Sequence, residues 1–223
     1  MEKYCQFCPV AKAAEILCEK WVILVLRELM MGSTRFGQLR RGLPRISPSI
    51  LSRRLKTLEE QGVINRIKKT DDTGYEYHLS ESGEELRPIV LGFGAWGHRW
   101  AKNKIAKEDL DAGFLLWDMR RRLNVEYFED ERIVIHIEFT DQNKHDRYWW
   151  MVIENGEIDL CFEDTGHDPD IIISTTLPVM TQIWLGYEKL NNMIEKRKLK
   201  MLGSKKHLKN ISKWIGKSTF ADK

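Results

Sequence analysis

The sequence lacks a long apolar segment. Its longest apolar run, Trp21–Leu26, ends at Arg27 and Glu28, whereas a helix that spans a bilayer needs roughly 20 such residues. The N-terminus has no charged-then-apolar leader pattern. Four cysteines in 223 residues are too few for a secreted disulfide framework. We therefore expect a cytoplasmic protein with reduced thiols and no membrane partner.

Motifs for enzymatic chemistry and metal binding are also scarce. The six histidines form no pair with metal-ligand spacing, and no nucleophile elbow, phosphate-binding glycine loop or zincin motif is present. Cys5 and Cys8 form a lone CxxC pair, which lacks the two further ligands of a typical zinc site. His167 and Asp168 lie at a turn between Gly166 and Pro169, where a solvated loop is the simpler explanation. We expect no enzyme activity, no cofactor and no metal.

Charge is distributed unevenly along the chain. Residues 33–69 carry ten Lys/Arg and two Glu, a net charge of +8, whereas residues 108–170 carry six Lys/Arg and eighteen Asp/Glu, a net charge of −12. Residues 189–217 are basic again. This asymmetry indicates segments with different partners, and a basic block is typical of proteins that bind polyanions. A solvated charged surface is the alternative explanation.

The first hundred residues alternate between apolar periodicity and turn signals. The expected elements are helices over 9–17 and 20–31, a short helix containing Phe36 and Leu39, helices over 47–61 and 80–100, and strands over 64–69 and 75–79. Ser47-Pro48 is a strong helix start, and residues 70–74 supply turn chemistry between the strands. We expect Ser80 or Ser82 to cap the last helix and Pro88 to bend it.

The helix over 47–61 has two different faces. Its apolar stripe consists of Leu51, Leu55 and Leu58. Its opposite face consists of Ser49, Ser52, Arg53 and Lys56, with Arg54 at the margin. An apolar back and a basic front suit a helix that lies in the major groove of double-stranded DNA, while basic groups on a hairpin suit phosphate. The candidate DNA-binding residues are Arg35, Ser47, Ser49, Ser52, Arg53, Arg54, Lys56, Arg66, Lys68 and Lys69.

These segments together resemble the HxlR family of bacterial winged helix-turn-helix regulators. The motifs that carry the resemblance are Cys8-Pro9-Val10-Ala11, Lys20-Trp21, Leu26-Arg27-Glu28-Leu29, Arg35-Phe36, Leu39-Arg40, Ile46-Ser47-Pro48, Leu51-Ser52-Arg53-Arg54-Leu55, Leu58-Glu59, Gly62-Val63-Ile64, Tyr77-His78-Leu79-Ser80, Gly83 and Trp96-Gly97. The resemblance covers most of the first half. It implies transcription regulation by a homodimer, packed partly through the terminal helices of this domain, on a near-palindromic operator.

The cysteines allow a second hypothesis. Cys8 matches the cysteine with which some HxlR-like regulators sense oxidants or electrophiles, and Cys5 lies close to it in the sequence. The alternative is that Cys8 is a small residue packed against the first helix. Cys18 and Cys161 are expected in the core.

The second half has the pattern of an α+β domain. A helix over 110–123 precedes strands over 133–140, 148–153, 157–162 and 170–174, a helix over 176–185, a short strand near 199–202 and a helix over 205–214. We expect two domains, a winged helix-turn-helix domain over 1–104 and an effector-binding domain over 105–223, because residues 102–109 lose the apolar pattern.

The second half also resembles the sterol carrier protein type 2-like domain. The motifs are Gly156-Glu157-Ile158-Asp159-Leu160, Pro169-Asp170-Ile171-Ile172-Ile173, Trp184-Leu185-Gly186 and Leu202-Gly203, with the basic Lys196-Arg197-Lys198 as a departure. The resemblance implies an apolar tunnel for a lipid-like small molecule. The candidate pocket residues are Trp117, Phe139, Trp150, Phe162, Met180 and Trp184, which an ordinary core explains equally well. A lipid carrier with a fused helical module and a domain that only dimerises remain open alternatives.

Overall fold

The computed structural model describes residues 3–69, 74–102, 105–128, 132–164 and 166–221. The chain divides into two units, residues 1–96 and 97–223. The predicted domain limit between residues 104 and 105 stays a prediction, since residues 103–104 lie outside the described ranges.

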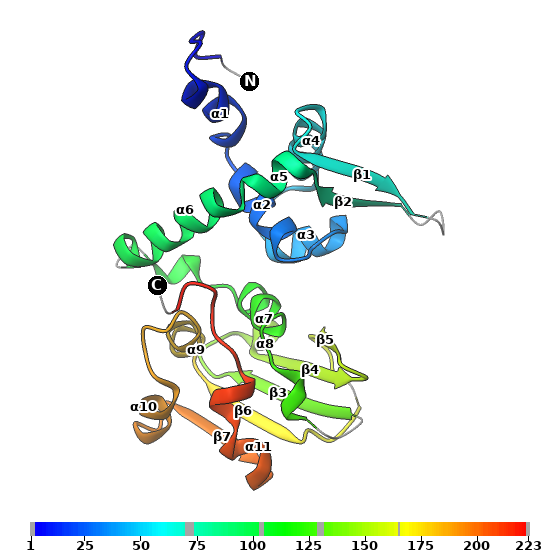
Figure 1. The fold of residues 1–223 in the computed structure, drawn as a ribbon. Coiled ribbons are helices and arrows are strands. Elements are labelled where there is room, and N and C mark those ends of the chain that lie inside the picture. The colour runs from blue at the N-terminus through cyan, green and yellow to red at the C-terminus, as the bar shows by residue number, and fades with distance from the viewer. Residues whose placement is uncertain (1–2, 70–73, 103–104, 129–131, 165, 222–223) are drawn as a thin grey trace. The chain divides into compact units, whose positions relative to one another are not determined.

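The first unit is a winged helix-turn-helix, and the predicted α+β class is confirmed (Figure 1). Its elements are α1 (Pro9–Leu17), α2 (Val22–Met30), α3 (Phe36–Gly42), α4 (Pro48–Glu60), β1 (Ile64–Lys68), β2 (Tyr75–Leu79), α5 (Glu81–Glu85) and α6 (Arg87–Trp100), whose last four residues belong to the second unit. Leucines of α2, α3 and α4 form the core, with Leu26, Leu39 and Leu51 fully buried. β1 and β2 form an antiparallel hairpin, the wing; residues 70–73 of its expected turn lie outside the described residues.

Two predicted helices are each two helices in the structure: the one over 205–214, which is divided at Asn210, and one in the first unit. The segment predicted as a single helix over 80–100 is interrupted at Leu86, between α5 and α6. Ser80 caps α5, because its Oγ accepts a hydrogen bond from the N–H of Gly83 at 3.2 Å. Pro88 does not bend a continuous helix; it lies in the first turn of α6, where a missing N–H donor costs little.

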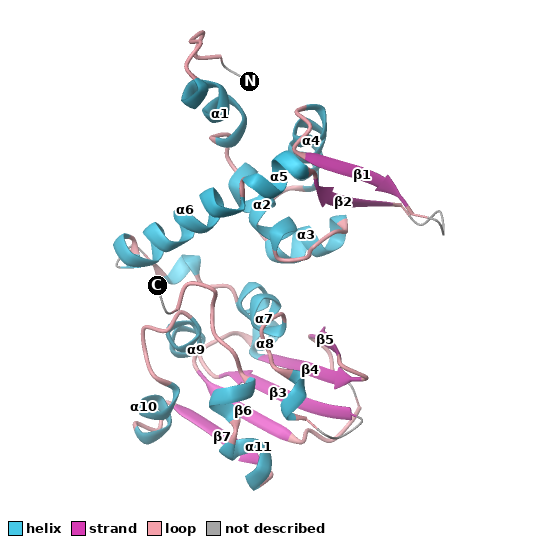
Figure 2. Ribbon diagram, viewed as in Figure 1, coloured by secondary structure: helices cyan, strands magenta, loops and turns pink. Residues whose placement is uncertain are grey.

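The second unit is a five-stranded sheet with helices. Its elements are η2 (Lys107–Asp109), α7 (Ala112–Arg120), η3 (Val125–Tyr127), β3 (Arg132–Phe139), α8 (Lys144–Arg147), β4 (Tyr148–Glu154), β5 (Glu157–Cys161), β6 (Ile171–Thr175), α9 (Leu177–Trp184), α10 (Leu190–Glu195), β7 (Leu199–Gly203), α11 (Lys205–Lys209) and α12 (Ile211–Trp214). The strand order is β5-β4-β3-β6-β7, and β3 and β6 are parallel (Figure 2). None of the described helices is long and apolar enough to cross a membrane.

Strand alternation decides which residues of the second unit are buried. Ile135 and Ile137 of β3 face the core with Leu116 of α7 and Met180 of α9. The residues between them on β3 face the other side of the sheet, where the His136 ring stacks on Trp150 of β4 with ring centroids 4.9 Å apart. The sheet therefore has one face packed in the main core and one that carries half-buried polar and aromatic groups.

Candidate DNA interface and ligand pocket

The front of α4 is exposed and its back is buried. The Ser47 Oγ accepts a hydrogen bond from the N–H of Ile50 at 3.3 Å, and Pro48 occupies the first turn, so the helix begins where the sequence predicts. The buried side chains are Leu51, Leu55 and Leu58. The exposed residues are Ser49, Ser52, Arg53 and Lys56. This surface can donate hydrogen bonds to base edges and to phosphates.

Arg54 differs from its neighbours on α4. Its side chain is only 12% exposed and forms an ion pair with Glu19, and its Nε donates to the carbonyl oxygen of Lys20 at 2.9 Å. Both partners lie between α1 and α2, so Arg54 ties α4 to that turn. Because Arg54 lies at the margin of the helix face, its side chain contacts the neighbouring protein segment. Arg54 therefore has a structural role, and its contact with DNA stays a prediction.

Arg35 joins the helices to the wing. It precedes α3, and its Nε donates to the carboxylate of Glu76 on β2 at 3.3 Å. A hydrogen bond from Arg35 and a weaker effect of the hydrogen bond with His78 lower the pKa of the Glu76 carboxyl group. The N–H of Tyr77 also donates to the carbonyl of Thr34 at 2.8 Å. These contacts hold β2 against the N-terminus of α3, which fixes the wing relative to α4 within the first unit.

The wing carries its basic residues on a strand supported by an aromatic ring. The guanidinium of Arg66 lies 3.5 Å from the ring centroid of Tyr75. Arg66 and Lys68 are exposed on β1, and the N–H of Lys69 closes the hairpin on the carbonyl of Gly74 at 3.0 Å. Cation–π contact with Tyr75 limits the conformations of the Arg66 side chain and keeps its charge at the surface.

A buried carboxylate, which was not predicted from the sequence, supports the turn between α2 and α3. Glu28 is 1% exposed; it accepts hydrogen bonds from Arg27 Nη2 at 2.8 Å and from Ser33 Oγ at 3.2 Å. Arg27 also donates to the carbonyl of Gly42 at 3.1 Å. The cluster links α2 to both ends of α3. An acidic residue inside an apolar helix, followed by Ser33, is the only sequence signal for it.

The cysteines occupy different positions from those expected. Cys8 is half-buried at the N-cap of α1, and Cys5 is exposed. Cys18 is exposed at the end of α1, so its predicted place in the core is wrong, and Cys161 is half-buried. The described residues contain no group of three or more His, Cys, Asp or Glu that could hold a metal ion.

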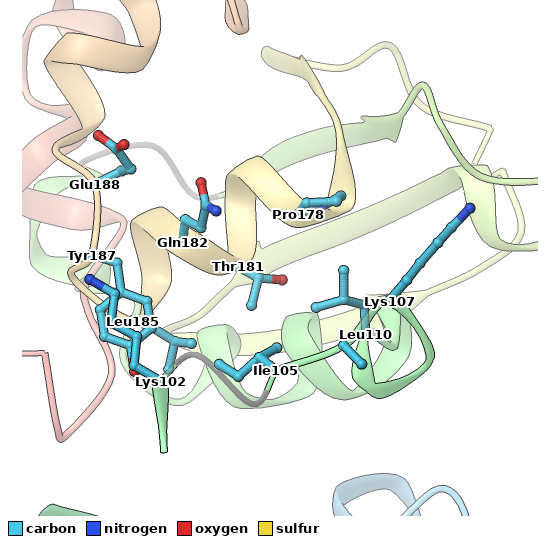
Figure 3. A pocket seen from close by; sticks show the side chains of 11 residues that line it. Lys102, Ile105, Lys107, Leu110, Pro178, Thr181, Gln182, Leu185, Tyr187 and Glu188 are labelled. Atoms are coloured by element: carbon cyan, nitrogen blue, oxygen red, sulfur yellow. The ribbon is translucent and has the colours of Figure 1, made fainter. Parts of the chain in front are cut away.

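A cavity of about 530 Å³ lies within the second unit, between Lys102, residues 105–110 and α9 (Figure 3). Apolar groups from both segments contribute most of its wall, with polar groups from α9 and the residues after it. The lining residues are Lys102, Ile105, Ala106, Lys107, Leu110, Pro178, Thr181, Gln182, Leu185, Tyr187 and Glu188. The volume is within the range of small-molecule sites.

None of the six predicted pocket residues lines this cavity. Four of them, Trp117, Phe139, Met180 and Trp184, are buried in the protein core. Trp150 lies on the opposite face of the sheet, and Phe162 is 60% exposed after β5. A ligand site at these six positions stays a prediction, and the observed cavity is lined instead by smaller apolar side chains such as Ile105 and Leu110 before α7.

One wall of the cavity is attached to the last turn of α6. The Tyr187 ring stacks on His98 with centroids 4.7 Å apart, and its hydroxyl donates to the His98 carbonyl at 3.2 Å. The Lys102 ammonium lies 4.3 Å from the centroid of the same ring. Burial raises the pKa of Tyr187. A molecule in the cavity would therefore lie next to the end of a helix that begins in the first unit.

The helices, the hairpin and the exposed face of α4 define a winged helix-turn-helix DNA-binding domain. Residues 16–105 match the family model described as HxlR-like helix-turn-helix. The chain is 37% identical over 97 residues to an uncharacterized HTH-type transcriptional regulator of Bacillus subtilis, covering 43% of this chain and 90% of that protein. It is 36% identical over 107 residues to one from Synechocystis, covering 48% and 79%. The chain belongs to the HxlR-like family of DNA-binding transcriptional regulators.

Two further comparisons were found. The reduced form of the redox regulator HypR covers 44% of this chain and all of its own, with 30% identity and a TM-score of 0.40. Residues 119–221 match the family model described as alkyl sulfatase C-terminal. The second half is thus similar to a different family from the sterol carrier protein type 2-like domain expected from its motifs.

Proposed function

We propose that this protein is a cytoplasmic transcriptional regulator that binds a near-palindromic operator as a homodimer. The observation that carries the proposal is the exposed face of α4, where Ser49, Ser52, Arg53 and Lys56 lie opposite three buried leucines. In this arrangement Arg53 reads guanine and the serines donate or accept single bonds at base edges. Ser47, Arg66, Lys68 and Lys69 contact phosphates, which sets the register without reading sequence.

An exposed apolar stripe on α6 supports the homodimer. Its members are Ile89, Phe93, Trp96 and Trp100, all exposed and spaced so that they share one helix face. Contiguous apolar surface of this kind is rarely left open on soluble monomers. A two-fold axis would pair the stripe with its copy and place two α4 helices on two half-sites. Phe7 before α1 and Val10 on α1 are further exposed apolar residues that a partner could cover.

Selection from a random-sequence duplex library tests this proposal directly. The full-length protein should enrich a near-palindromic site, and the complex with that site should contain two chains. Enrichment of an asymmetric site bound by one chain would overturn the homodimer. If the protein enriches no DNA site and instead transfers lipid between vesicles, the alternative of a carrier protein would be favoured.

The second unit is proposed to bind an apolar small-molecule effector in the cavity beside α9. The support is the cavity volume of about 530 Å³ and the apolar side chains of Ile105, Leu110, Pro178 and Leu185 in its wall. Because Tyr187 joins this wall to His98 of α6, an occupant that shifts Tyr187 would alter the end of that helix. Regulation requires that the effector bind the DNA-bound and DNA-free states with different affinities.

The similarity of residues 119–221 to a family named for alkyl sulfatases suggests the first probe. Decyl sulfate below its micellar concentration would be titrated into the full-length protein, with 1-decanol as its uncharged counterpart. Saturable binding that Leu185→Trp abolishes, without loss of fold, is expected because the indole fills the cavity. Binding that Leu185→Trp leaves intact would place the ligand elsewhere.

A thiol-based redox sensor acting through Cys8 is the second candidate. Cys8 is a free, half-buried thiol at the N-cap of a nine-residue helix, and Cys5 lies exposed nearby in the sequence. Mild oxidation should change operator affinity in the wild type and leave Cys8→Ser unaffected. Equal affinity of the reduced and oxidised wild type would exclude this candidate.

A further inference from the structure

The end of the chain carries a dense basic surface that the helix-turn-helix does not explain. Residues 189–217 contain ten Lys/Arg and a single acidic residue, Glu195, a net charge of +9. All ten basic residues are exposed. They lie in the same unit as the strongly acidic residues 108–170, so the charge within this unit is segregated by segment.

The centre of this surface is the edge strand β7. β7 pairs with β6 along one side and is the last strand of the sheet (Figure 1). A strand of five residues spans about 17 Å. Lys196, Arg197 and Lys198 precede it, Lys200 lies on it, and α11 with Lys205 and Lys209 follows it. We call these six residues the basic edge.

The charges of the basic edge are not neutralised by ion pairs within the described part of the chain. None of its six residues forms an ion pair with another of the described residues. In the first unit, by contrast, Lys56 is paired with Glu60 at 3.7 Å and Arg35 with Glu76 at 3.3 Å. Clustered like charges repel one another and destabilise the compact state, so a polyanion would be attracted to this edge.

Protection of the sheet edge is a weaker explanation. Charged residues, Lys above all, prevent an edge strand from pairing with other chains. That purpose is met by Lys200 on the strand itself and does not account for three consecutive cations before it and three on the helix after it. The number of cations and their spread over both ends of β7 suit an extended anion.

We propose that the basic edge is a second phosphate-binding surface, occupied by the backbone of duplex DNA beyond the site that α4 contacts. The DNA held by the helix-turn-helix is present at high effective concentration for the tethered second unit. Membrane surfaces are a poorer fit, because Leu202 is the single exposed large apolar residue described within 189–217. Phosphate contacts of this kind add affinity and salt dependence but no sequence preference.

The test uses a triple variant of the full-length protein, Lys196→Gln with Lys198→Gln and Lys200→Gln. Arg197 is left unchanged because its φ of +55° makes substitution there a risk to the turn. Affinity for a mixed-sequence DNA duplex would be measured between about 50 and 200 mM salt. Each lost phosphate contact reduces the slope of log affinity against log salt by about 0.9, so we expect a reduction of about two to three.

The matched control removes the same charge elsewhere, with Lys3→Gln, Lys12→Gln and Lys144→Gln. It should keep the wild-type slope, and thermal unfolding should show that both variants are folded. If the two variants have the same slope, the basic edge does not contact DNA. If the triple variant keeps the wild-type slope but loses binding to phosphatidylglycerol vesicles, the surface serves a membrane and the proposal is wrong.

Discussion

The carboxylate of Glu28 occupies the space that a Cβ atom on Gly42 would need. Glu28 is on α2 and Gly42 is the last residue of α3, so the absence of a side chain at Gly42 lets the two helices approach. The carboxylate cannot move away freely, because it accepts hydrogen bonds from Arg27 and Ser33. The packing of the helix-turn-helix core therefore depends on the absence of a side chain at Gly42.

Gly42→Ala should destabilise the first unit. The added methyl group overlaps Glu28, and overpacking of a filled interior costs about 1–3 kcal/mol. Urea unfolding followed by a probe in the first unit measures the loss. Gly37→Ala is the control on the same helix: no atom lies within 4 Å of its Cβ position, so the helix should gain about 0.5–1 kcal/mol. Equal effects of the two substitutions would contradict the steric argument.

Arg53→Ala and Arg54→Ala should affect different properties, although the residues are adjacent. Arg53 is exposed on the front of α4, so its loss should weaken operator binding by about 1–3 kcal/mol and leave stability unchanged. Arg54 is bound to Glu19 and Lys20, so its loss should lower the free energy of unfolding by about 1–3 kcal/mol. Fluorescence anisotropy with an operator and urea unfolding separate the two effects. Loss of operator affinity in Arg54→Ala protein of unchanged stability would show that Arg54 contacts DNA.

Regular patterns in the sequence were enough to predict the winged helix-turn-helix fold. Ser47-Pro48 and the leucine spacing that follows predicted α4, and the exposed face agrees with the predicted one. The role of Arg54 could not be assigned from the sequence, because its partners are 34 and 35 positions away. Helical spacing gives only the direction in which its side chain leaves the helix. Glu28 was missed for the same reason, since its burial depends on Ser33 and Gly42 in the folded chain.

The predicted pocket residues do not line the observed cavity, because composition does not show which side of a strand a residue occupies. Trp149 and Trp150 are adjacent, yet Trp149 packs against the main core and Trp150 stacks on the other face of the sheet. The wall of the observed cavity comes partly from residues 105–110, which the loss of apolar pattern had marked as a connection between domains.

Phe93→Glu should convert the protein to a monomer. Phe93 is in the exposed apolar stripe of α6, and a carboxylate placed in a two-fold interface meets its own copy without a counter-charge. Sedimentation at several protein concentrations measures the change, and operator affinity should fall with dimerisation. Phe162→Glu introduces the same exchange at another exposed position and should have no effect on assembly. A wild-type protein that is already monomeric on its operator would rule out this interface.

His136 should make the second unit less stable in mild acid. Burial lowers the pKa of His136, and the nearby charges of Glu138 and Asp164 oppose this only in part. The unfolded chain, in which histidine has a pKa of about 6.5, takes up the proton first as pH falls, so stability is present above that pH and declines below it. The unfolding midpoint should therefore fall between about pH 7 and pH 5, and His136→Gln should flatten this dependence. His145→Gln, at an exposed position, should keep the wild-type profile; if it flattens the profile as much as His136→Gln does, the burial of His136 is not the cause.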